Sequence, residues 1–266
     1  MSLIRIAARI AAVQALKGKT LVGNNVLDSQ IGAIDIAADG AVRTDREEPF
    51  ISVYCDGGTN AGTDAHLRAL RMNGATTFLF EAAYTAAYAT TDPETGAAVT
   101  LEGIPATDAS FEFYLDLVIR QIGDALNDPN NEWAEIFRRF CTRFDSVERA
   151  RTSGDGSGAR LAAHQLKVVA ELMADPKTEP PEGTPLFEFF AMAEALEDPA
   201  VDAKVALMRA AINGDLLDWE RPLQRFGLTR GEADAMLITP AGGTDAADTM
   251  IAETDAAPAD PAGGEQ

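Results

Sequence analysis

The predicted fold depends first on one stretch, Arg46-Glu47-Glu48-Pro49-Phe50-Ile51-Ser52-Val53-Tyr54-Cys55-Asp56-Gly57-Gly58. Pro49 fits the first residue of a strand, because a proline cannot donate a hydrogen bond to a neighbouring strand. Residues 50–55 are mostly β-branched, aromatic or small, a composition typical of a half-buried strand. Asp56-Gly57-Gly58 predicts the end of that strand, since glycine permits the positive φ of a sharp turn.

The end of this strand at Asp56 has two interpretations. One is an Asx turn that leaves the sheet for a surface loop, which we favour. The other is a catalytic carboxylate, because Asp-Gly after a strand resembles the ribonuclease H-like nucleases. A metal-dependent nuclease of that kind needs further carboxylates that converge with Asp56 on two metal ions about 4 Å apart. Glu81, Glu112 and Asp116 are the carboxylates that we nominate for that role.

The composition indicates a globular protein without a cofactor. The chain has 266 residues, of which 46% are hydrophobic, so a core needs no disulfide staples. Cys55 and Cys141 fall in a predicted strand and a predicted helix, so we expect two free thiols. His66 and His164 fit no metal-ligand spacing and accompany no nucleophile elbow, so we expect no metal site and no catalytic residue. No apolar run approaches the ~20 residues that span a bilayer.

The chain is strongly acidic, with a formal net charge of −20 at pH 7. Wrapping nucleic acid needs clustered lysine and arginine, and an anionic membrane attracts basic segments, so we expect neither partner. Residues 239–266 hold six acidic residues and no basic one. That segment has too little apolar surface to offset the entropy of ordering it, and we predict a disordered acidic tail.

The rest of the chain alternates helical and strand patterns. Apolar spacings of three and four predict helices over residues 3–17, 108–126, 132–144 with an extension through 149, 184–196, 199–212, 219–226 and 229–237. Short or alternating apolar patterns predict strands over residues 26–30, 50–55 and 76–89. Turn-forming residues predict loops over residues 37–48, 57–74 and 90–107, with a helical turn around 66–70, a hairpin around 97–101 and a further hinge at 153–158.

Residues 76–89 carry the clearest alternation in the sequence. Phe78, Phe80, Tyr84 and Tyr88 fall on one face of the predicted strand. The simplest interpretation is that this aromatic face belongs to the core. The alternative is a face that stays open in the monomer and is covered by a neighbouring subunit.

Two further patterns are less decisive. Residues 160–173 fit a strand, with His164 and Leu166 on one face, and also fit a helix, so periodicity alone does not decide between them. A basic run with helical spacing comprises Arg138, Arg139, Arg143, Arg149 and Arg151. Acidic residues lie within this run, so we interpret it as a solvated or interface face rather than a nucleic-acid site.

Four stretches, in this order, resemble a known family. They are Leu3-Ile4-Arg5-Ile6-Ala7-Ala8-Arg9-Ile10-Ala11-Ala12-Val13-Gln14-Ala15-Leu16-Lys17-Gly18-Lys19-Thr20 followed by Val26-Leu27-Asp28-Ser29; Pro49-Phe50-Ile51-Ser52-Val53-Tyr54; Thr77-Phe78-Leu79-Phe80-Glu81; and Gly158-Ala159-Arg160-Leu161-Ala162-Ala163-His164-Gln165-Leu166-Lys167-Val168, running into Asp175-Pro176. Together they resemble the tail terminator, or tail-completion, proteins of long-tailed bacteriophages and gene transfer particles. The resemblance covers roughly residues 1–175 and is a pattern of helices and strands, without a catalytic signature.

This resemblance implies an α+β fold, with a mostly antiparallel sheet flanked by helices, and it favours a strand over residues 160–173. We therefore predict a terminator-like domain over residues 1–175. A C-terminal helical extension would occupy residues 184–238, and the disordered acidic tail would occupy residues 239–266. A minimal terminator would need neither of these last two segments.

The resemblance also implies a structural virion protein of the tail or neck, present in the host cytoplasm during assembly. Copies of the chain would form a ring, of six subunits, that caps the tail tube, ends tail growth and forms part of the head–tail junction. Its partners would be other copies, the major tail tube protein and a head–tail connector or neck protein, with DNA only passing through the lumen and no membrane. Another neck or head–tail connector protein is the alternative within this class.

A closed ring requires that one patch of each subunit meets a different patch of the next. We nominate as assembly-interface residues Asp28, Tyr54, Asp56, Phe78, Tyr84, Tyr88, Arg138 and Arg139.

Overall fold

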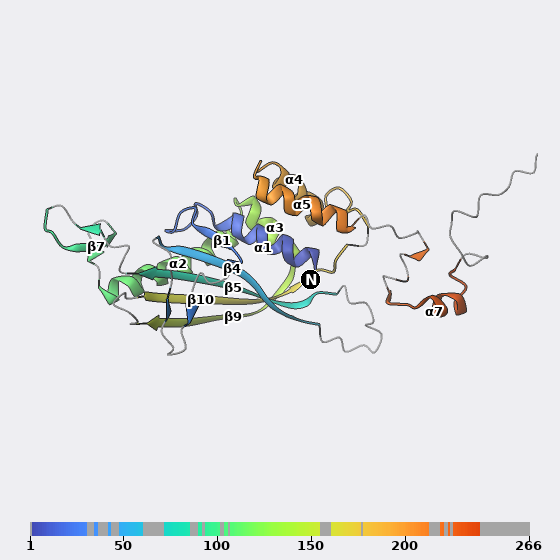
Figure 1. Cartoon of the computed structure of the whole chain (residues 1–266), viewed down its shortest axis with the longest axis horizontal. Coiled ribbons are helices and arrows are strands. Elements are labelled where there is room, and N and C mark those ends of the chain that lie inside the picture. Colours follow the sequence, from blue (N-terminus) through green and yellow to red (C-terminus); the bar gives the residue numbers. More distant parts are fainter. Residues whose placement is uncertain are drawn as a thin grey trace, which may run out of the picture. The chain divides into compact units, whose positions relative to one another are not determined.

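A computed structural model gives the fold of the chain. It describes residues 2–30, 35–36, 42–43, 48–60, 72–85, 90–91, 94–101, 104–105, 107–154, 161–176, 178–212, 219–220, 223 and 226–239. The chain divides into two compact units, Met1–Gly214 and Asp215–Gln266, and each is described by itself. The fold is α+β, as predicted: helices cover one face of a five-stranded, mostly antiparallel sheet (Figure 1).

The main sheet has the strand order β1-β4-β5-β10-β9. Its strands are β1 (Val26–Asp28), β4 (Phe50–Thr59), β5 (Gly74–Thr85), β10 (Leu161–Leu172) and β9 (Cys141–Gly154). β1 runs parallel to β4, and every other neighbouring pair is antiparallel. One cross-strand row shows the register: Val53 lies opposite Phe80, Phe80 opposite Leu166, and Leu166 opposite Arg149.

Two small sheets accompany the main one. β2 (Asp35–Ile36) pairs with β3 (Val42–Arg43), so a strand pair lies where the sequence predicted a bend and a polar loop. β6 (Thr90–Thr91), β7 (Ala98–Leu101) and β8 (Ile104–Pro105) form a three-stranded sheet, which confirms the predicted hairpin.

Several helices begin after polar residues whose side chains accept backbone N–H groups. Ser2 caps α1 (Leu3–Leu16) by accepting from Arg5 N. α2 (Asp108–Asn127) begins after Thr107, whose side chain accepts from Ser110 N. Asn131 caps α3 (Glu132–Phe140). Each cap satisfies N–H groups that the first turn of a helix leaves without an internal partner.

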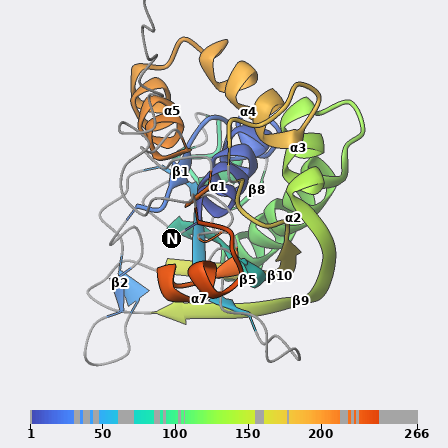
Figure 2. The ribbon, with the colours of Figure 1, turned by 90° about the vertical axis from the view of Figure 1, so that its right-hand side faces the viewer.

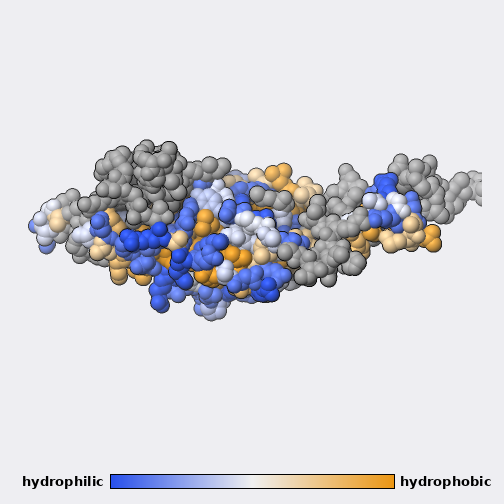
Figure 3. Space-filling view, turned by 90° about the horizontal axis from the view of Figure 1, so that it is seen from below, coloured by the Kyte–Doolittle hydropathy of each residue, from blue (hydrophilic) through white to orange (hydrophobic). Residues whose placement is uncertain are grey.

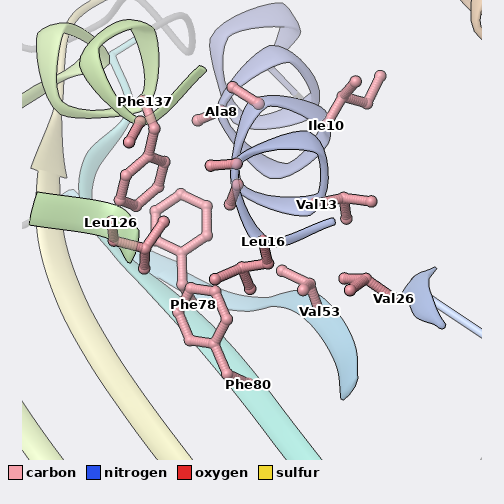
Figure 4. Packing of buried hydrophobic residues seen from close by; sticks show 14 of the residues in the cluster. Ala8, Ile10, Val13, Leu16, Val26, Val53, Phe78, Phe80, Leu126 and Phe137 are labelled. Atoms are coloured by element: carbon pink, nitrogen blue, oxygen red, sulfur yellow. The ribbon is translucent and has the colours of Figure 1, made fainter. Parts of the chain in front are cut away.

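The core lies between the sheet and a layer formed by α1, α2 and α3. In Figure 4, apolar side chains of α1 meet Phe78 and Phe80 from β5, and Phe137 reaches down from α3. Phe78 and Phe137 meet edge to face, with ring centroids 5.3 Å apart. The predicted interpretation of the aromatic face of β5 as core is confirmed for the residues that the structure describes, Phe78, Phe80 and Tyr84, which are at most 1% exposed.

α4 (Pro185–Glu194) and α5 (Pro199–Ile212) form an outer layer over this core (Figures 1 and 2). Phe189 and Phe190 of α4 are fully buried in the same hydrophobic cluster as the sheet. The predicted boundary at residue 175 therefore needs correction. These helices complete the core of the first unit instead of forming a separate extension, and that unit ends at Gly214.

β4 is longer than predicted. The sequence predicted an end at Asp56, but the strand continues to Thr59 because Gly58 and Thr59 still pair with β5. Asp56 and Gly57 form a bulge in this ladder. The predicted strand-terminating Asx turn is wrong.

β9 replaces a predicted helix. The sequence predicted helix through residue 144 or 149, but α3 ends at Phe140 and strand begins at Cys141. The basic run is therefore split between a helix and a strand, and its predicted helical spacing is wrong. Both cysteines are free, as predicted, and burial raises the pKa of the Cys141 thiol to about 12.

β10 covers most of residues 160–173, the segment whose pattern fitted both a helix and a strand. Residues 161–172 are a strand with partners on both sides, as the family resemblance predicted. His164, Leu166 and Val168 all lie buried on its helix-covered face.

Within the second unit, α7 (Arg230–Ala235) begins with a reciprocal capping box between Thr229 and Glu232.

Other predictions lie wholly or partly outside the described residues: the bend at 31–34, the helical turn and His66 at 66–70, Tyr88, the hinge beyond Gly154, most of 219–226 and the tail beyond residue 239. No helix that the structure describes is both long and apolar enough to cross a membrane.

Candidate functional site

Phe78 and Tyr84 are not available for contacts with another subunit. Phe78 is 0% exposed and Tyr84 is 1% exposed. The ring of Tyr84 lies 4.5 Å from that of Tyr114 and 5.1 Å from that of Phe111, both on α2. The helices of the same chain cover these side chains, so their nomination as interface residues is corrected. Tyr88 lies outside the described residues.

Asp28 is used inside the subunit. Its two carboxylate oxygens each bind a cation at 2.6 Å, one from Arg9 of α1 and one from Lys204 of α5. The carboxylate is 19% exposed, so these are partly desolvated ion pairs rather than a free acidic surface. Asp28 therefore joins the edge strand β1 to two helices.

Arg138 and Arg139 also have partners within the chain. Arg138 donates to the carbonyl oxygens of Leu126 and Asp128, at the C-terminal end of α2, where a cation suits the exposed carbonyls. Arg139 pairs with Glu188 of α4, and this hydrogen bond raises the arginine's pKa. Both arginines hold helices together, so neither is a free interface charge.

Tyr54 follows the buried Val53 in β4, so it lies on the face of the sheet opposite the helices, and the charge of Asp56 acts on Glu81 of the same face. Figure 3, which views the molecule from below, shows hydrophilic residues around hydrophobic ones on this side. The Tyr54 hydroxyl donates to the carbonyl oxygen of Gln30 at 2.9 Å. The neighbouring Glu81 accepts a hydrogen bond from Gln165 at 2.6 Å. Burial raises the pKa of Glu81, the charge of Asp56 raises it further, and hydrogen bonds from Gln165 and Tyr54 oppose that rise.

The carboxylates nominated for a nuclease do not converge. Asp56 and Glu81 interact on the face opposite the helices, whereas Glu112 and Asp116 contact His164 on the helix-covered face. The sheet itself separates the two pairs. Across the described part of the chain, no three histidine, cysteine, aspartate or glutamate side chains come together to hold a metal ion.

His164 links α2 to the sheet. Its Nε2 lies 3.1 Å from Glu112 and its Nδ1 lies 3.5 Å from Asp116, so the two carboxylates contact opposite sides of the ring. Arg151 of β9 binds the other oxygen of Glu112 at 2.8 Å. Opposite ring nitrogens cannot bind one ion, and the cluster therefore links α2 to β10 and β9 through the hydrogen bond between His164 and Glu112 and the ion pair between Arg151 and Glu112.

The edge strand β9 carries a surface that sequence reasoning missed. Phe144 and Val147 are 47% and 49% exposed, although their β10 partners Ala170 and Val168 are buried. Arg149 follows on the same face and is exposed. We call Phe144, Val147 and Arg149 the β9 strip. The mistaken helix prediction hid it, because only the strand places these residues together at one edge.

A pocket of ≈ 430 Å³ opens where α1 begins. It is lined by Ser2, Leu3, Arg5, Gly58, Asn60, Met72, Asn73, Asp175, Pro176 and Ala211. Residues from both ends of the first unit meet here, which explains why no single stretch of sequence indicated it. Gly58 belongs to the Asp56-Gly57-Gly58 motif, so this motif shapes a pocket wall instead of ending a strand.

Comparison with known proteins adds no assignment. No protein-family model matches this sequence, and no curated protein matches it.

Proposed function

We propose that the protein is a structural subunit that forms a ring at the end of a bacteriophage-like tail tube, where it stops tube growth and contributes to the head–tail junction. In this role the chain is not an enzyme. The proposal rests on the four-part resemblance, whose segments correspond to α1 with β1, β4, β5 and β10.

The observation that carries the proposal is the strand β10. Residue patterns alone left residues 160–173 open between helix and strand, and only the family resemblance favoured a strand. β10 is a strand in the interior of the sheet, paired along its length with β5 and β9. The resemblance thus made a structural prediction that periodicity did not make, and this agreement supports the family resemblance.

The β9 strip is the surface that we assign to contact between copies. Exposed apolar side chains that lie together on the surface of a monomer, beside polar residues, mark sites of contact with other proteins. The strip includes the exposed Arg149 in a chain of net charge −20, so an acidic surface of a second copy complements it. Such a contact joins two different patches, as a ring requires.

Electron microscopy and light scattering of the purified protein, alone and with tail tube protein, test this proposal. We expect rings, and we expect tube preparations to stop lengthening when the protein is added. Val147→Asp places a charge in the β9 strip and is expected to abolish rings while leaving the fold intact, because Val147 is half-exposed. Leu207→Asp, at a residue of α5 that is 73% exposed, is the matched control and should leave rings unchanged.

The proposal fails if the protein stays monomeric at every concentration, with tube protein present as well as without it. Equal loss of rings in Val147→Asp and Leu207→Asp would move the interface away from the β9 strip, without rejecting the ring.

A further inference from the structure

We propose that the pocket at the start of α1, here called the Arg5 pocket, binds the oxyanion group of a small organic acid through the guanidinium of Arg5. The pocket and its lining residues are those given above. This inference does not depend on the proposed ring, because it rests on the charge and shape of one subunit.

The guanidinium of Arg5 has spare donors. Its Nε donates to the sulfur of Cys55 at 3.3 Å, and no carboxylate among the described residues forms an ion pair with it. Most other described arginines bind a carboxylate or backbone carbonyls. Arg5 is half-buried and lies against the wall of the pocket. A planar guanidinium with free N–H groups matches the two oxygens of a carboxylate or phosphate.

Asp175 does not cancel this charge. Its carboxylate accepts hydrogen bonds from the Ser2 hydroxyl at 2.5 Å and from the backbone N–H groups of Leu3 and Ile4 at 3.1 Å. The side-chain amide of Asn73 lies 3.4 Å from the same carboxylate. The first turn of α1 carries a partial positive charge that offsets part of the charge of the aspartate. The positive charge of Arg5 is therefore the one left for a ligand.

The wall beside Arg5 is built so that the guanidinium can lie close to the backbone. A Cβ on Gly58 would lie 3.3 Å from the Nη1 of Arg5 and 3.6 Å from the Oγ1 of Thr76. That threonine hydroxyl is fully buried and has no hydrogen-bond partner in the described part of the chain. The side chain of Asn60 adds a further polar group to the lining of the pocket.

The remaining walls indicate what the acid carries. Leu3, Met72, Pro176 and Ala211 add apolar groups to the lining of the pocket. A volume of ≈ 430 Å³ falls in the range of small-ligand sites, and exceeds what a bare inorganic anion fills. The ligand class is thus an acid with a short apolar body. It can be a free small molecule or an acidic side chain of a second copy of this chain.

Butyrate, with inorganic phosphate as a second probe, tests the site in the full-length protein at constant ionic strength. We expect saturable shifts of the Arg5 Nε–Hε resonance and of the Gly58 amide resonance in nuclear magnetic resonance spectra. Arg5→Met should weaken butyrate binding at least tenfold, and Arg5→Lys should recover part of it. Arg120→Met removes the same charge from an exposed position on α2, and should leave binding unchanged.

Gly58→Val keeps every charge but pushes the guanidinium aside, and should also weaken butyrate binding. Circular dichroism of each variant shows that it is folded. The inference is overturned if neither probe gives saturable binding to the folded protein, or if Arg120→Met weakens binding as much as Arg5→Met does.

A third measurement identifies the source of the acid. If a second copy supplies it, Arg5→Met reduces self-association and butyrate competes with that association. If the ligand is a free acid, self-association is the same in both proteins while butyrate binding still distinguishes them. A monomeric protein that binds butyrate through Arg5 rejects the ring and retains this inference.

Discussion

Asp175 holds the start of the first helix in place. Its carboxylate accepts from Ser2, Leu3 and Ile4, so it satisfies N–H groups that α1 leaves open. We predict that Asp175→Ala lowers the free energy of unfolding by about 1–3 kcal/mol, measured by urea denaturation. Asp124→Ala, which removes an exposed i,i+4 ion pair with Arg120, should change it by less than about 0.5 kcal/mol. Equal effects of the two changes would contradict this role of Asp175.

Glu81 makes stability depend on pH. Because its pKa is raised in the folded protein, the folded chain holds this proton more tightly than the unfolded chain does. The stabilisation is complete below the ordinary value of 4.5 and is lost as pH rises through the folded pKa. We predict that Glu81→Gln raises the urea midpoint at pH 7 and has little effect at pH 4. The amide that replaces the carboxylate can still accept the hydrogen bond from Gln165.

Glu182→Gln is the control for this pH dependence, because Glu182 is an exposed carboxylate in a turn. It should leave the urea midpoint unchanged at both pH values. A Glu81→Gln protein that is less stable than the unmodified protein at pH 7 would show that the hydrogen bonds of the carboxylate outweigh its burial.

At the scale of elements, the pairing of β4 with β5 depends on a glycine. Gly74, the first residue of β5, has φ +58°, and a Cβ there would lie 2.5 Å from the carbonyl oxygen of Thr59. We predict that Gly74→Ala destabilises the protein by about 1–3 kcal/mol. Gly123→Ala, inside α2 with open space around it, should instead stabilise by about 0.5–1 kcal/mol. Thermal unfolding of both variants checks that the first substitution lowers the stability and the second raises it.

Local patterns predicted the elements whose residues decide their own structure. α1, α2 and β5 each carry a long apolar period, and each was predicted within a few residues of its ends. The strand β9 was not predicted, because Phe140, Phe144 and Val147 continue the helical spacing of α3. Its strand form comes from pairing with β10, which lies later in the chain. Nonlocal pairing overrode the local period.

The surfaces were harder to predict than the fold, because they too depend on contacts between residues that are far apart in the sequence. The bulge after Cys55 exists because the register of β5 requires it, and residues 56–58 alone indicate a turn. Asp28, Arg138 and Arg139 looked free because their partners Lys204, Leu126 and Glu188 are distant or unremarkable in sequence. Charge in a sequence does not show whether a side chain is already paired.

For the whole molecule, the first unit should fold without the second. Residues 1–214 form one compact unit that contains the entire main sheet and the helices α1 to α5. We predict that removing residues 215–266 leaves the thermal midpoint within about 2 °C. Removing residues 184–266 should unfold or aggregate the protein, because it takes Phe189 and Phe190 out of the core. Calorimetry of the two truncations distinguishes these outcomes.

The shorter truncation also tests which unit carries the proposed ring function. If the first unit alone forms rings and limits tube length, the second unit is not needed for that function. If tubes grow without a fixed length when residues 215–266 are removed, the proposed tube termination requires both units.

The hydrogen bonds of Asp175 also affect how this protein folds during its synthesis on the ribosome. Ser2 and Asp175 are 173 residues apart in the chain. At a synthesis rate of about 5–20 residues per second, roughly 9–35 s pass between the appearance of α1 and that of its cap. α1 buries nine residues against elements that are made later. During translation this helix is therefore an uncovered apolar segment, and factors that bind nascent chains have their clearest target in α1.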